Sequence, residues 1–377
     1  MKDVLFIIEG LFGGGAERAL VELLKHIDYA RYNVTLGVVF AGGIYTKEIP
    51  SQVNLFHIFS DNETSFESSL RRKALRYCKK YGNTWLLKFL FRQKCKKHHF
   101  DTIISFIEGY PILFHSTICK WAKLNISWIH CDLYYQHWTT AYYHSDHDEK
   151  RCYEKMDKIV FVSRNSMESF NRLYETSNDK MHLYNIVDAE NIRRLAKQKV
   201  VMHDRFTITS IGSLYKVKGY DRLVRVAKLF KDKGYALRFQ ILGQGKEFES
   251  LLRMRDELGL QEDVVFLGFE ENPYPYLRQS DIFVSTSLSE GLSYVICEAL
   301  VLGIPVVATK TSGGMELLEN GKYGILTEHD DASIYEAIKK LVDSTTLCKE
   351  YQEKSLSRSN IFNIDETMAV SYTHLTL

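Results

Sequence analysis

The 377-residue chain is longer than one hydrophobic core usually supports, so we expect two domains of roughly 150 to 190 residues. Lysine and arginine number 49 against 47 acidic residues, and the formal net charge of +2 gives no global reason to expect nucleic acid or a strongly acidic partner. The seven cysteines are widely spaced, which favours a reducing, cytoplasmic compartment. No apolar run has the length of a signal peptide or a membrane span.

Short apolar runs alternate with longer segments of helical period, which is the pattern of a parallel sheet covered by helices on both faces. The runs predict five strands in each half, at 4–8, 34–40, 102–106, 126–129 and 159–162, and at 207–211, 237–242, 264–267, 282–285 and 306–308. The charged stretch 188–205 is predicted to connect the two sets. We therefore predict an α/β fold with two doubly wound, Rossmann-like parallel-sheet domains, at 1–187 and 188–360. Ligands of such sheets bind beyond the carboxyl ends of the strands.

A pair of carboxylates follows the predicted strand 282–285. Seven residues separate Glu290 from Glu298, and a helix that begins near Ser293 would hold Glu298 just over one turn inside, with Glu290 on the preceding loop. A rise of about 1.5 Å per residue puts the carboxylates on the order of 10 Å apart, close to the span from ribose to sugar in a nucleotide sugar. A diphosphate between them would face the positive helix end and the N–H groups of Gly291, Leu292, Ser293 and Tyr294. The alternative is a solvated Glu290 and a surface carboxylate at Glu298.

This segment resembles glycosyltransferase family 4, whose retaining enzymes have the GT-B fold, with two Rossmann-like domains facing across a cleft, and an E-x7-E motif. The resemblance implies that Glu290 contacts the donor sugar and Glu298 the ribose. Residues 212–221 look like the family's G-R-L…K-G segment, in which Lys218 matches the lysine that binds the diphosphate and stabilises the departing nucleotide. Ser213 replaces the family arginine, which leaves donor affinity and identity open, although Lys216 could substitute.

Further matches extend the resemblance over nearly all of residues 205 to 330. Gly243 and Gly268 match family glycines that let the backbone approach the nucleoside, although each could also be a plain turn glycine. The segments 303–308 and 312–316 complete the pattern in the family's order.

In the first half, a glycine loop follows the first predicted strand and leads into a helix predicted at 19–26. The loop is not a G-x-G-x-x-G, and the second strand ends without the acidic residue that grips a ribose, which argues against a nicotinamide oxidoreductase. By the resemblance it is the family's G-G-A-E loop, which closes over the donor phosphate and borders the acceptor pocket through Gly13, Gly14 and Gly15. A merely structural turn is the alternative.

Two other segments of the first half fit the resemblance. Residues 128–132 resemble the segment whose histidine, here His130, hydrogen-bonds the donor sugar, although a strand-end histidine is more often structural. Asn185 and Asp188 match the family hinge, in which Ile186 replaces a glycine.

The sequence predicts no required metal. Asp146-His147-Asp148 spells D-x-D, the metal signature of a different glycosyltransferase fold, but it lies in the polar stretch 142–150 and not at a strand end. The histidines nearby lack closed ligand spacing. The nucleoside diphosphate sugar would be a co-substrate, and no cofactor is expected.

The stretch from Arg71 to Lys97 holds eleven lysines and arginines and no acid, interleaved with Trp85 and other apolar residues. It could rest on anionic lipid, with each basic residue worth about 1 kcal/mol, or it could be a solvated helix face. At the C-terminus, Asn363 or Asp365 could cap a helix within 361–377, and the family's final helix crosses back to the first domain. Ser371 to Leu377 does not continue the helical pattern, which suggests a truncation or a cloning scar.

The hypothesis is a retaining hexosyltransferase that moves a sugar from a nucleoside diphosphate sugar to a hydroxyl of a glycan or lipid-linked acceptor, in bacterial capsule, exopolysaccharide or lipopolysaccharide assembly. It would be cytoplasmic, with a place at the inner face of the cell membrane, and would not bind nucleic acid. Two alternatives stay open, a sugar-nucleotide-binding protein without turnover and a NAD-dependent oxidoreductase.

Overall fold

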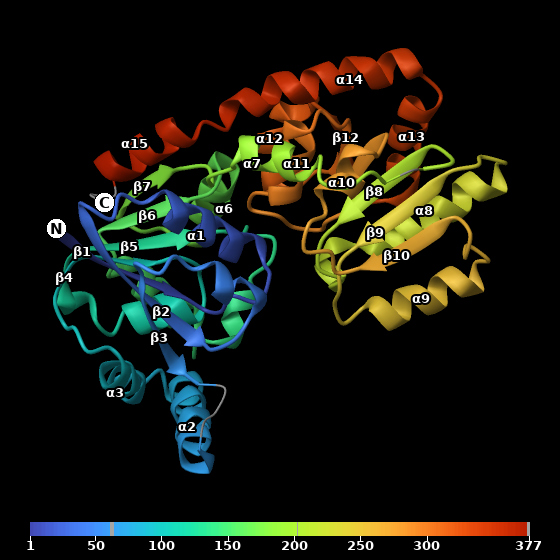
Figure 1. Ribbon diagram of the computed structural model, residues 1–377. Coiled ribbons are helices and arrows are strands. Elements are labelled where there is room, and N and C mark those ends of the chain that lie inside the picture. Colours follow the sequence, from blue (N-terminus) through green and yellow to red (C-terminus); the bar gives the residue numbers. More distant parts are fainter. Residues whose placement is uncertain (61–63, 202, 375–377) are drawn as a thin grey trace. The chain divides into compact units, whose positions relative to one another are not determined.

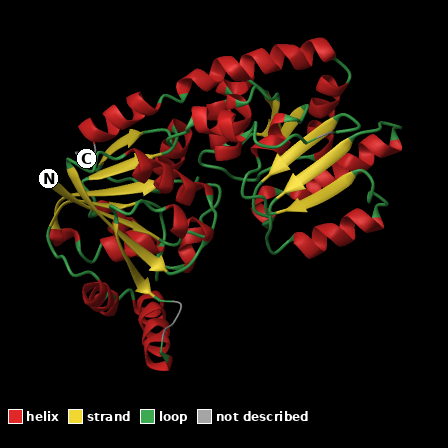
Figure 2. Cartoon of the chain, viewed as in Figure 1, coloured by secondary structure: helices red, strands yellow, loops and turns green. Residues whose placement is uncertain are grey.

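The computed structural model describes residues 1–60, 64–201 and 203–374. The chain divides into two compact units, one formed by Met1–Ile186 with Ile364–Leu377 and the other by Val187–Asn363. Each unit is a parallel sheet with helices packed against it (Figures 1 and 2). Each has its own hydrophobic core, because strands that are covered on both faces bury nearly every side chain.

The first unit contains a seven-stranded parallel sheet in the order β3-β2-β1-β4-β5-β6-β7. Its strands are β1 (Lys2–Ile8), β2 (Tyr32–Phe40), β3 (Asn54–Phe59), β4 (Phe100–Ser105), β5 (Ala122–Ile129), β6 (Lys158–Phe161) and β7 (Asp179–His182). Its helices are α1 (Gly15–His26), α2 (Ser65–Tyr81), α3 (Trp85–Lys94), α4 (Tyr110–His115), α5 (Asp146–Glu154), α6 (Arg164–Leu173) and α15 (Ile364–His374).

The second unit contains a six-stranded parallel sheet in the order β10-β9-β8-β11-β12-β13. Its strands are β8 (Thr207–Ile211), β9 (Arg238–Leu242), β10 (Val264–Gly268), β11 (Ile282–Ser285), β12 (Val306–Thr309) and β13 (Ile325–Thr327). Its helices are α7 (Ala189–Leu195), α8 (Tyr220–Asp232), α9 (Phe248–Glu257), α10 (Tyr274–Arg278), α11 (Tyr294–Val301), α12 (Ser312–Leu317), α13 (Asp331–Val342) and α14 (Thr345–Arg358).

Both sheets reverse their strand order at an inner strand. The chain runs outward from β8 to β9 and β10, and then returns to the other side of β8 at β11. The first sheet reverses in the same way between β1 and β4. Loops leave such a point in opposite directions and open a crevice at the carboxyl ends of the strands, so each unit has a preferred ligand position there.

All ten predicted strands are confirmed, whereas the expected start of the first helix and the expected end of the last helix were wrong. Helix α1 begins at Gly15 and not at residue 19, because Gly14 is its N-cap and Glu17 binds the backbone of the preceding loop. The predicted connection 188–205 contains α7. Helix α15 continues through Ser371 to His374, whereas 375–377 lie outside the described residues. Over the described residues, none of the helices combines the length and apolar character that a membrane crossing needs.

Candidate functional site

Two loops meet at the carboxyl ends of β8 and β11, the reversal point of the second sheet. Thr286 Oγ1 donates to the backbone oxygens of Lys218 and Gly219, at 2.9 and 3.0 Å. The Leu288 N–H donates to the Val217 oxygen at 2.7 Å. The backbone around Lys218 is therefore fixed against the loop that carries Glu290.

Lys218 and Glu290 form an ion pair at this junction. The Lys218 ammonium donates to Glu290 Oε1, which also accepts from Ser287 Oγ at 2.8 Å. The two side chains are 25% and 14% exposed, so the pair is partly shielded from solvent yet reachable. The solvated Glu290 of the alternative interpretation is wrong, because this carboxylate is held by Lys218 from the neighbouring loop and by Ser287 from its own loop.

Glu298 lies just over one turn inside α11, as the sequence predicted, and it is buried, with 8% exposed. Tyr274, on the short helix α10, donates its hydroxyl to Glu298 Oε1 at 2.9 Å. The surface carboxylate of the alternative interpretation is therefore wrong as well. A buried carboxylate that has a fixed hydroxyl partner is oriented for hydrogen bonds with a ligand's hydroxyl groups.

The turn that leads into α11 is tightly packed. Ser293 is the N-cap of α11, with an extended backbone and no side-chain bond to the first turn, while Gly291 and Leu292 are buried. The Gly313 N–H donates to the Glu290 backbone oxygen at 2.8 Å, and a Cβ on Gly313 would stand 2.7 Å from the Leu292 Cα. Glycine at 313 therefore allows α12 to support the Glu290 turn, beside the positive end of α11.

Gly243 allows a close approach between the loops after β8 and β9. Its φ of +139° is rarely adopted by other residues, and a Cβ there would stand 1.9 Å from the Gly212 oxygen. The Gly243 N–H donates to the Gly268 oxygen at 2.7 Å, and Gly268 itself has a φ of +76°. Ser213 is exposed in the same region.

In the first unit, His130 stands directly beyond the carboxyl end of β5. Its N–H donates to Glu108 Oε2 at 2.9 Å, and its ring packs on Phe106 with the centroids 4.9 Å apart. Burial lowers the pKa of His130 to about 3, so the imidazole is neutral near pH 7. Its Nε2 is shielded from water and has no hydrogen-bond partner among the described residues.

The glycine loop of the first unit has its N–H groups occupied. The Gly13 and Gly14 N–H groups donate to Glu17 Oε2 at 2.6 and 3.0 Å, while Gly15 is the first residue of α1. Burial raises the pKa of the Glu17 carboxyl. A phosphate that bound to these two N–H groups would have to displace Glu17.

Sequence reasoning missed three further acids in this unit. Glu9 follows β1, accepts from the Tyr142 hydroxyl at 3.3 Å and has a pKa that burial raises to about 7. Glu108 is buried and accepts from the Cys131 thiol as well as from the His130 N–H. Asp132 is also buried. The available signal was their position, because all three lie within three residues of a strand's carboxyl end.

The Asp146-His147-Asp148 segment does not contribute to this site. Asp146 and Asp148 lie in the first turn of α5, where the helix N-terminus favours acids and where Ser145 caps the Asp148 N–H. Across residues 1–60, 64–201 and 203–374, no group of three or more His, Cys, Asp or Glu side chains is placed to hold a metal ion.

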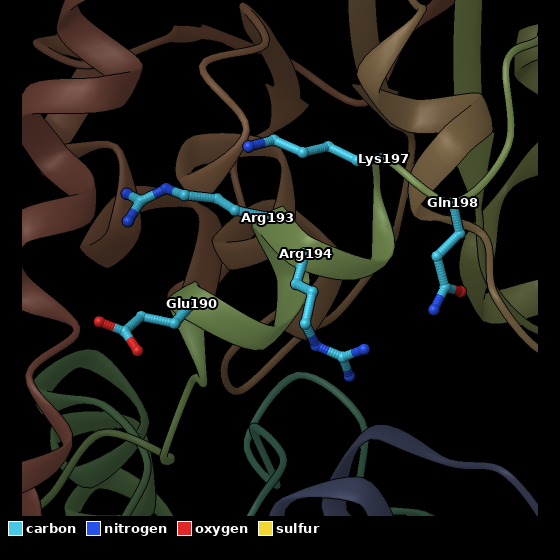
Figure 3. A pocket seen from close by; sticks show the side chains of 5 residues that line it. All are labelled: Glu190, Arg193, Arg194, Lys197 and Gln198. Carbon is cyan, nitrogen blue, oxygen red and sulfur yellow. The ribbon is translucent and has the colours of Figure 1, made fainter.

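A hollow of about 630 Å³ is lined by the α7 region, namely by Glu190, Arg193, Arg194, Lys197 and Gln198 (Figure 3). In Figure 3, Arg194 points away from Arg193 and Lys197, so the three cations do not converge. Arg193 also donates to the oxygen of Val301, which is the last residue of α11, at the end remote from Glu290. We therefore place the candidate site at the β8 and β11 loops and not in this hollow.

The class of fold follows from the two reversing parallel sheets. The crystal structure of Anabaena HepE in complex with UDP and glucose superposes on this chain over the full length of both proteins. The TM-score is 0.78 and the sequence identity is 20%. The chain therefore has the GT-B fold, as the resemblance implied.

Sequence comparison narrows the class further. Residues 191–358 match the model of the family described as "Glycosyl transferases group 1". The N-acetylgalactosamine-N,N'-diacetylbacillosaminyl-diphospho-undecaprenol 4-alpha-N-acetylgalactosaminyltransferase of Campylobacter jejuni is 35% identical over 215 residues, which are 56% of this chain and 58% of that protein. The poly(ribitol-phosphate) alpha-N-acetylglucosaminyltransferase of Staphylococcus aureus is 26% identical over 62% of this chain and 48% of that protein.

The chain thus spans about half the length of these curated relatives. The family match and the relatives together support a glycosyltransferase with the GT-B fold.

Proposed function

We propose that this protein is a retaining glycosyltransferase that moves a sugar from a nucleoside diphosphate sugar to a hydroxyl of a glycan or lipid-linked acceptor. The observation that carries the proposal is the Lys218–Glu290 ion pair at the start of α11, with the buried Glu298 one turn further along. This arrangement offers a cation for a diphosphate and two carboxylates for sugar and ribose hydroxyls, within one rigid junction.

In the proposed complex each residue binds one part of the donor. Glu290 accepts hydrogen bonds from hydroxyls of the donor sugar, and Glu298 accepts from the ribose. Lys218 and the N–H groups at the start of α11 stabilise the negative charge that develops on the leaving diphosphate. The glycines at 243 and 268 let the nucleoside approach the backbone, and Ser213 offers a hydroxyl where a cation is absent.

The proposed chemistry keeps the anomeric configuration. The acceptor oxygen bonds to the anomeric carbon on the face that the diphosphate leaves, and a departing phosphate oxygen takes the acceptor's proton. No covalent protein nucleophile and no metal are required in this scheme. From the first unit, His130 donates or accepts a hydrogen bond with the donor sugar as a neutral imidazole, while the loop at Gly13, Gly14 and Gly15 binds phosphate once Glu17 has moved.

We propose that the acceptor belongs to bacterial surface polysaccharide assembly, at the cytoplasmic side of the membrane. The printed names of the two relatives give two kinds of acceptor, a sugar carried on diphospho-undecaprenol and a poly(ribitol-phosphate) chain. Either kind of acceptor carries both hydroxyl groups and anionic phosphate groups.

Helices α2 and α3 support a peripheral membrane contact over the stretch Arg71 to Lys97. Helix α2 projects from the rest of the first unit, and α3 lies beside it (Figure 1). Trp85 and Phe89 on α3 and Tyr77 and Tyr81 on α2 are exposed together with most of the basic side chains. Aromatic side chains among exposed cations suit an anionic lipid surface.

The proposal is tested by thermal shift with UDP-, GDP- and ADP-sugars, repeated with Glu298→Ala. We expect one donor class to stabilise the wild type and to lose most of that effect in the variant, because the ribose loses its buried carboxylate. Equal stabilisation of both proteins would refute the ribose assignment. Donor consumption in the presence of acceptor then separates an enzyme from a protein that binds nucleotide sugars without turnover.

A further inference from the structure

Two tyrosines stand exposed beyond the carboxyl end of β5 in the first unit. Tyr134 is 48% exposed and Tyr135 is 65% exposed, although neighbouring Leu133 is buried. Their ring centroids lie 5.4 Å apart and the ring planes meet at 87°. The pair therefore forms a corner with two aromatic faces nearly at right angles.

The backbone beneath this corner is fixed. Asp132 is almost completely buried, and its Oδ1 accepts the N–H groups of both tyrosines at 3.1 Å. Its Oδ2 accepts from Ser169 Oγ, on α6, at 2.9 Å. Large exposed aromatic groups on a rigid turn lose little entropy when they bind a ligand, because their backbone is already ordered.

The corner lies at the ligand-binding edge of the first sheet. His130, with its neutral ring, is four positions before Tyr134 on the same turn. Another exposed aromatic residue, Phe12, lies on the loop after β1, which is separated from β5 by β4 alone. Strands are spaced by about 4.8 Å, so the ends of β1 and β5 are roughly 10 Å apart, about the size of one or two sugar rings.

We propose that Tyr134 and Tyr135 are the stacking surface for a pyranose ring of the acceptor, and that they select a ring sugar over an open-chain polyol. This inference rests on the proposed function and deepens it. A pyranose presents a flat patch of polarised C–H groups, which packs against the electron-rich face of an aromatic ring. An open-chain polyol has no such face, so the corner discriminates by shape.

Saturation-transfer NMR tests this with methyl α-D-glucopyranoside, methyl N-acetyl-α-D-galactosaminide and ribitol as probes. We expect transfer to the ring C–H protons of at least one pyranoside and none to ribitol. Replacing both tyrosines by alanine should weaken pyranoside binding roughly tenfold or more. Replacing both by phenylalanine should leave binding within about twofold to threefold, because the ring faces remain. Phe66→Ala, which removes an exposed aromatic side chain from α2 outside the stretch Arg71 to Lys97, is the matched control and should leave pyranoside binding unchanged.

The inference is overturned if ribitol binds as well as the pyranosides, if the double alanine variant binds them like the wild type, or if the wild type binds neither pyranoside. Thermal shift with UDP-sugars on the same variants separates this result from the proposed function. Variants that keep the donor shift and lose pyranosides support the tyrosine corner. A wild type that binds pyranosides through the tyrosines but responds to no nucleotide sugar contradicts the proposed function alone.

Discussion

At the scale of single residues, the two charges of the candidate donor site neutralise each other when no ligand is bound. Lys218 donates to Glu290, and both side chains are mostly shielded from water. An anionic diphosphate must therefore compete with the carboxylate for the ammonium group, whereas a sugar hydroxyl must compete with the ammonium for the carboxylate. Removal of the lysine should therefore weaken the binding of a nucleotide that carries no sugar, whereas removal of the carboxylate should not weaken it.

Lys218→Ala should weaken UDP binding roughly 10- to 100-fold, which is the effect of losing a charge-assisted hydrogen bond. Glu290→Gln should leave UDP affinity unchanged or raise it, because the lysine no longer has an anionic partner, while turnover falls sharply. Isothermal titration with UDP measures the first effect and release of UDP from the donor measures the second. Lys340→Ala, which removes an exposed lysine from α13, is the control and should be nearly neutral. A loss of UDP affinity in Glu290→Gln would contradict the competition.

A buried histidine of the first unit makes its stability sensitive to acid. His115 lies between Asn125 Oδ1 and Ser105 Oγ, each at 3.1 Å from a ring nitrogen. The Asn125 oxygen can only accept, so the neutral ring carries its proton on Nε2. Burial lowers the pKa of His115 from 6.5 to about 4. The unfolded chain therefore binds this proton first, and stability is lost as the pH falls from about 6.5 to about 4.

His115→Gln should flatten this pH dependence. The wild type should lose up to about 1.4 kcal/mol in the free energy of unfolding per pH unit relative to the variant, between about pH 6.5 and pH 4. Urea unfolding at a series of pH values measures the difference. His144→Gln removes an exposed histidine and should leave the slope of the wild type. Parallel curves for wild type and His115→Gln would show that this side chain does not titrate differently on unfolding.

The sequence alone could suggest those candidate-site residues that a pattern within a short segment defines. Glu290 and Glu298 are separated by a fixed spacing around a helix start, and a strand followed by a glycine turn brings Lys218 to the same edge. Glu9, Glu108 and Asp132 were missed because their positions in the sequence do not show which partners they contact. Glu108 accepts the N–H of His130, 22 residues away, and such a pairing has no signature in either segment.

At the scale of elements, glycines without a Cβ allow the turns after neighbouring strands to come into close contact. Gly243→Ala would push a Cβ into the Gly212 backbone oxygen, so we expect a loss of about 3 kcal/mol in the free energy of unfolding and weaker donor binding. Gly259→Ala is the matched control, because Gly259 also has a positive φ, +66°, but a Cβ there meets no atom within 4 Å. It should cost about 1 kcal/mol and leave donor binding intact. Thermal unfolding with and without UDP measures both effects.

The three strands that sequence patterns missed all lie at sheet edges. The strands β3 and β7 flank the first sheet, and β13 is one edge of the second. An edge strand is covered less completely, and β7, with the sequence DKMH, has no buried residue. Continuous apolar runs identify central strands, whereas an edge strand is defined by its hydrogen bonds to a neighbour.

At the scale of the whole molecule, the first unit contains segments from both ends of the chain. Tyr372 on α15 stacks on Tyr32 of β2 with the centroids 5.6 Å apart, and its hydroxyl donates to the His26 oxygen at 3.3 Å. The Asp28 N–H donates to the same hydroxyl at 3.0 Å. The sequence from Ser371 onward shows no helical apolar pattern, and the contacts of the single side chain of Tyr372 are not visible in such a pattern.

The proposed membrane contact also concerns the molecule as a whole, because it depends on the sum of many weak electrostatic interactions. Lys73, Arg76 and Arg92 on α2 and α3 are exposed and have no acidic partner among the described residues. Each basic residue near an anionic surface contributes about 1 kcal/mol, so their joint replacement by glutamate should weaken binding to phosphatidylserine vesicles by 100-fold or more. Cosedimentation measures this, and high salt should abolish the binding of the wild type.

A variant with the same change in net charge, but on the second unit, shows whether vesicle binding depends on α2 and α3 or on the net charge of the protein. Lys246, Lys340 and Lys349 are exposed on the second unit, and their replacement by glutamate changes the net charge of the protein by the same amount. If α2 and α3 form the contact, this variant keeps most of its vesicle binding, because the altered charges lie outside the contact and are screened within about 10 Å. Equal losses in both variants, or equal binding to neutral vesicles, would mean that these two helices are an ordinary solvated surface.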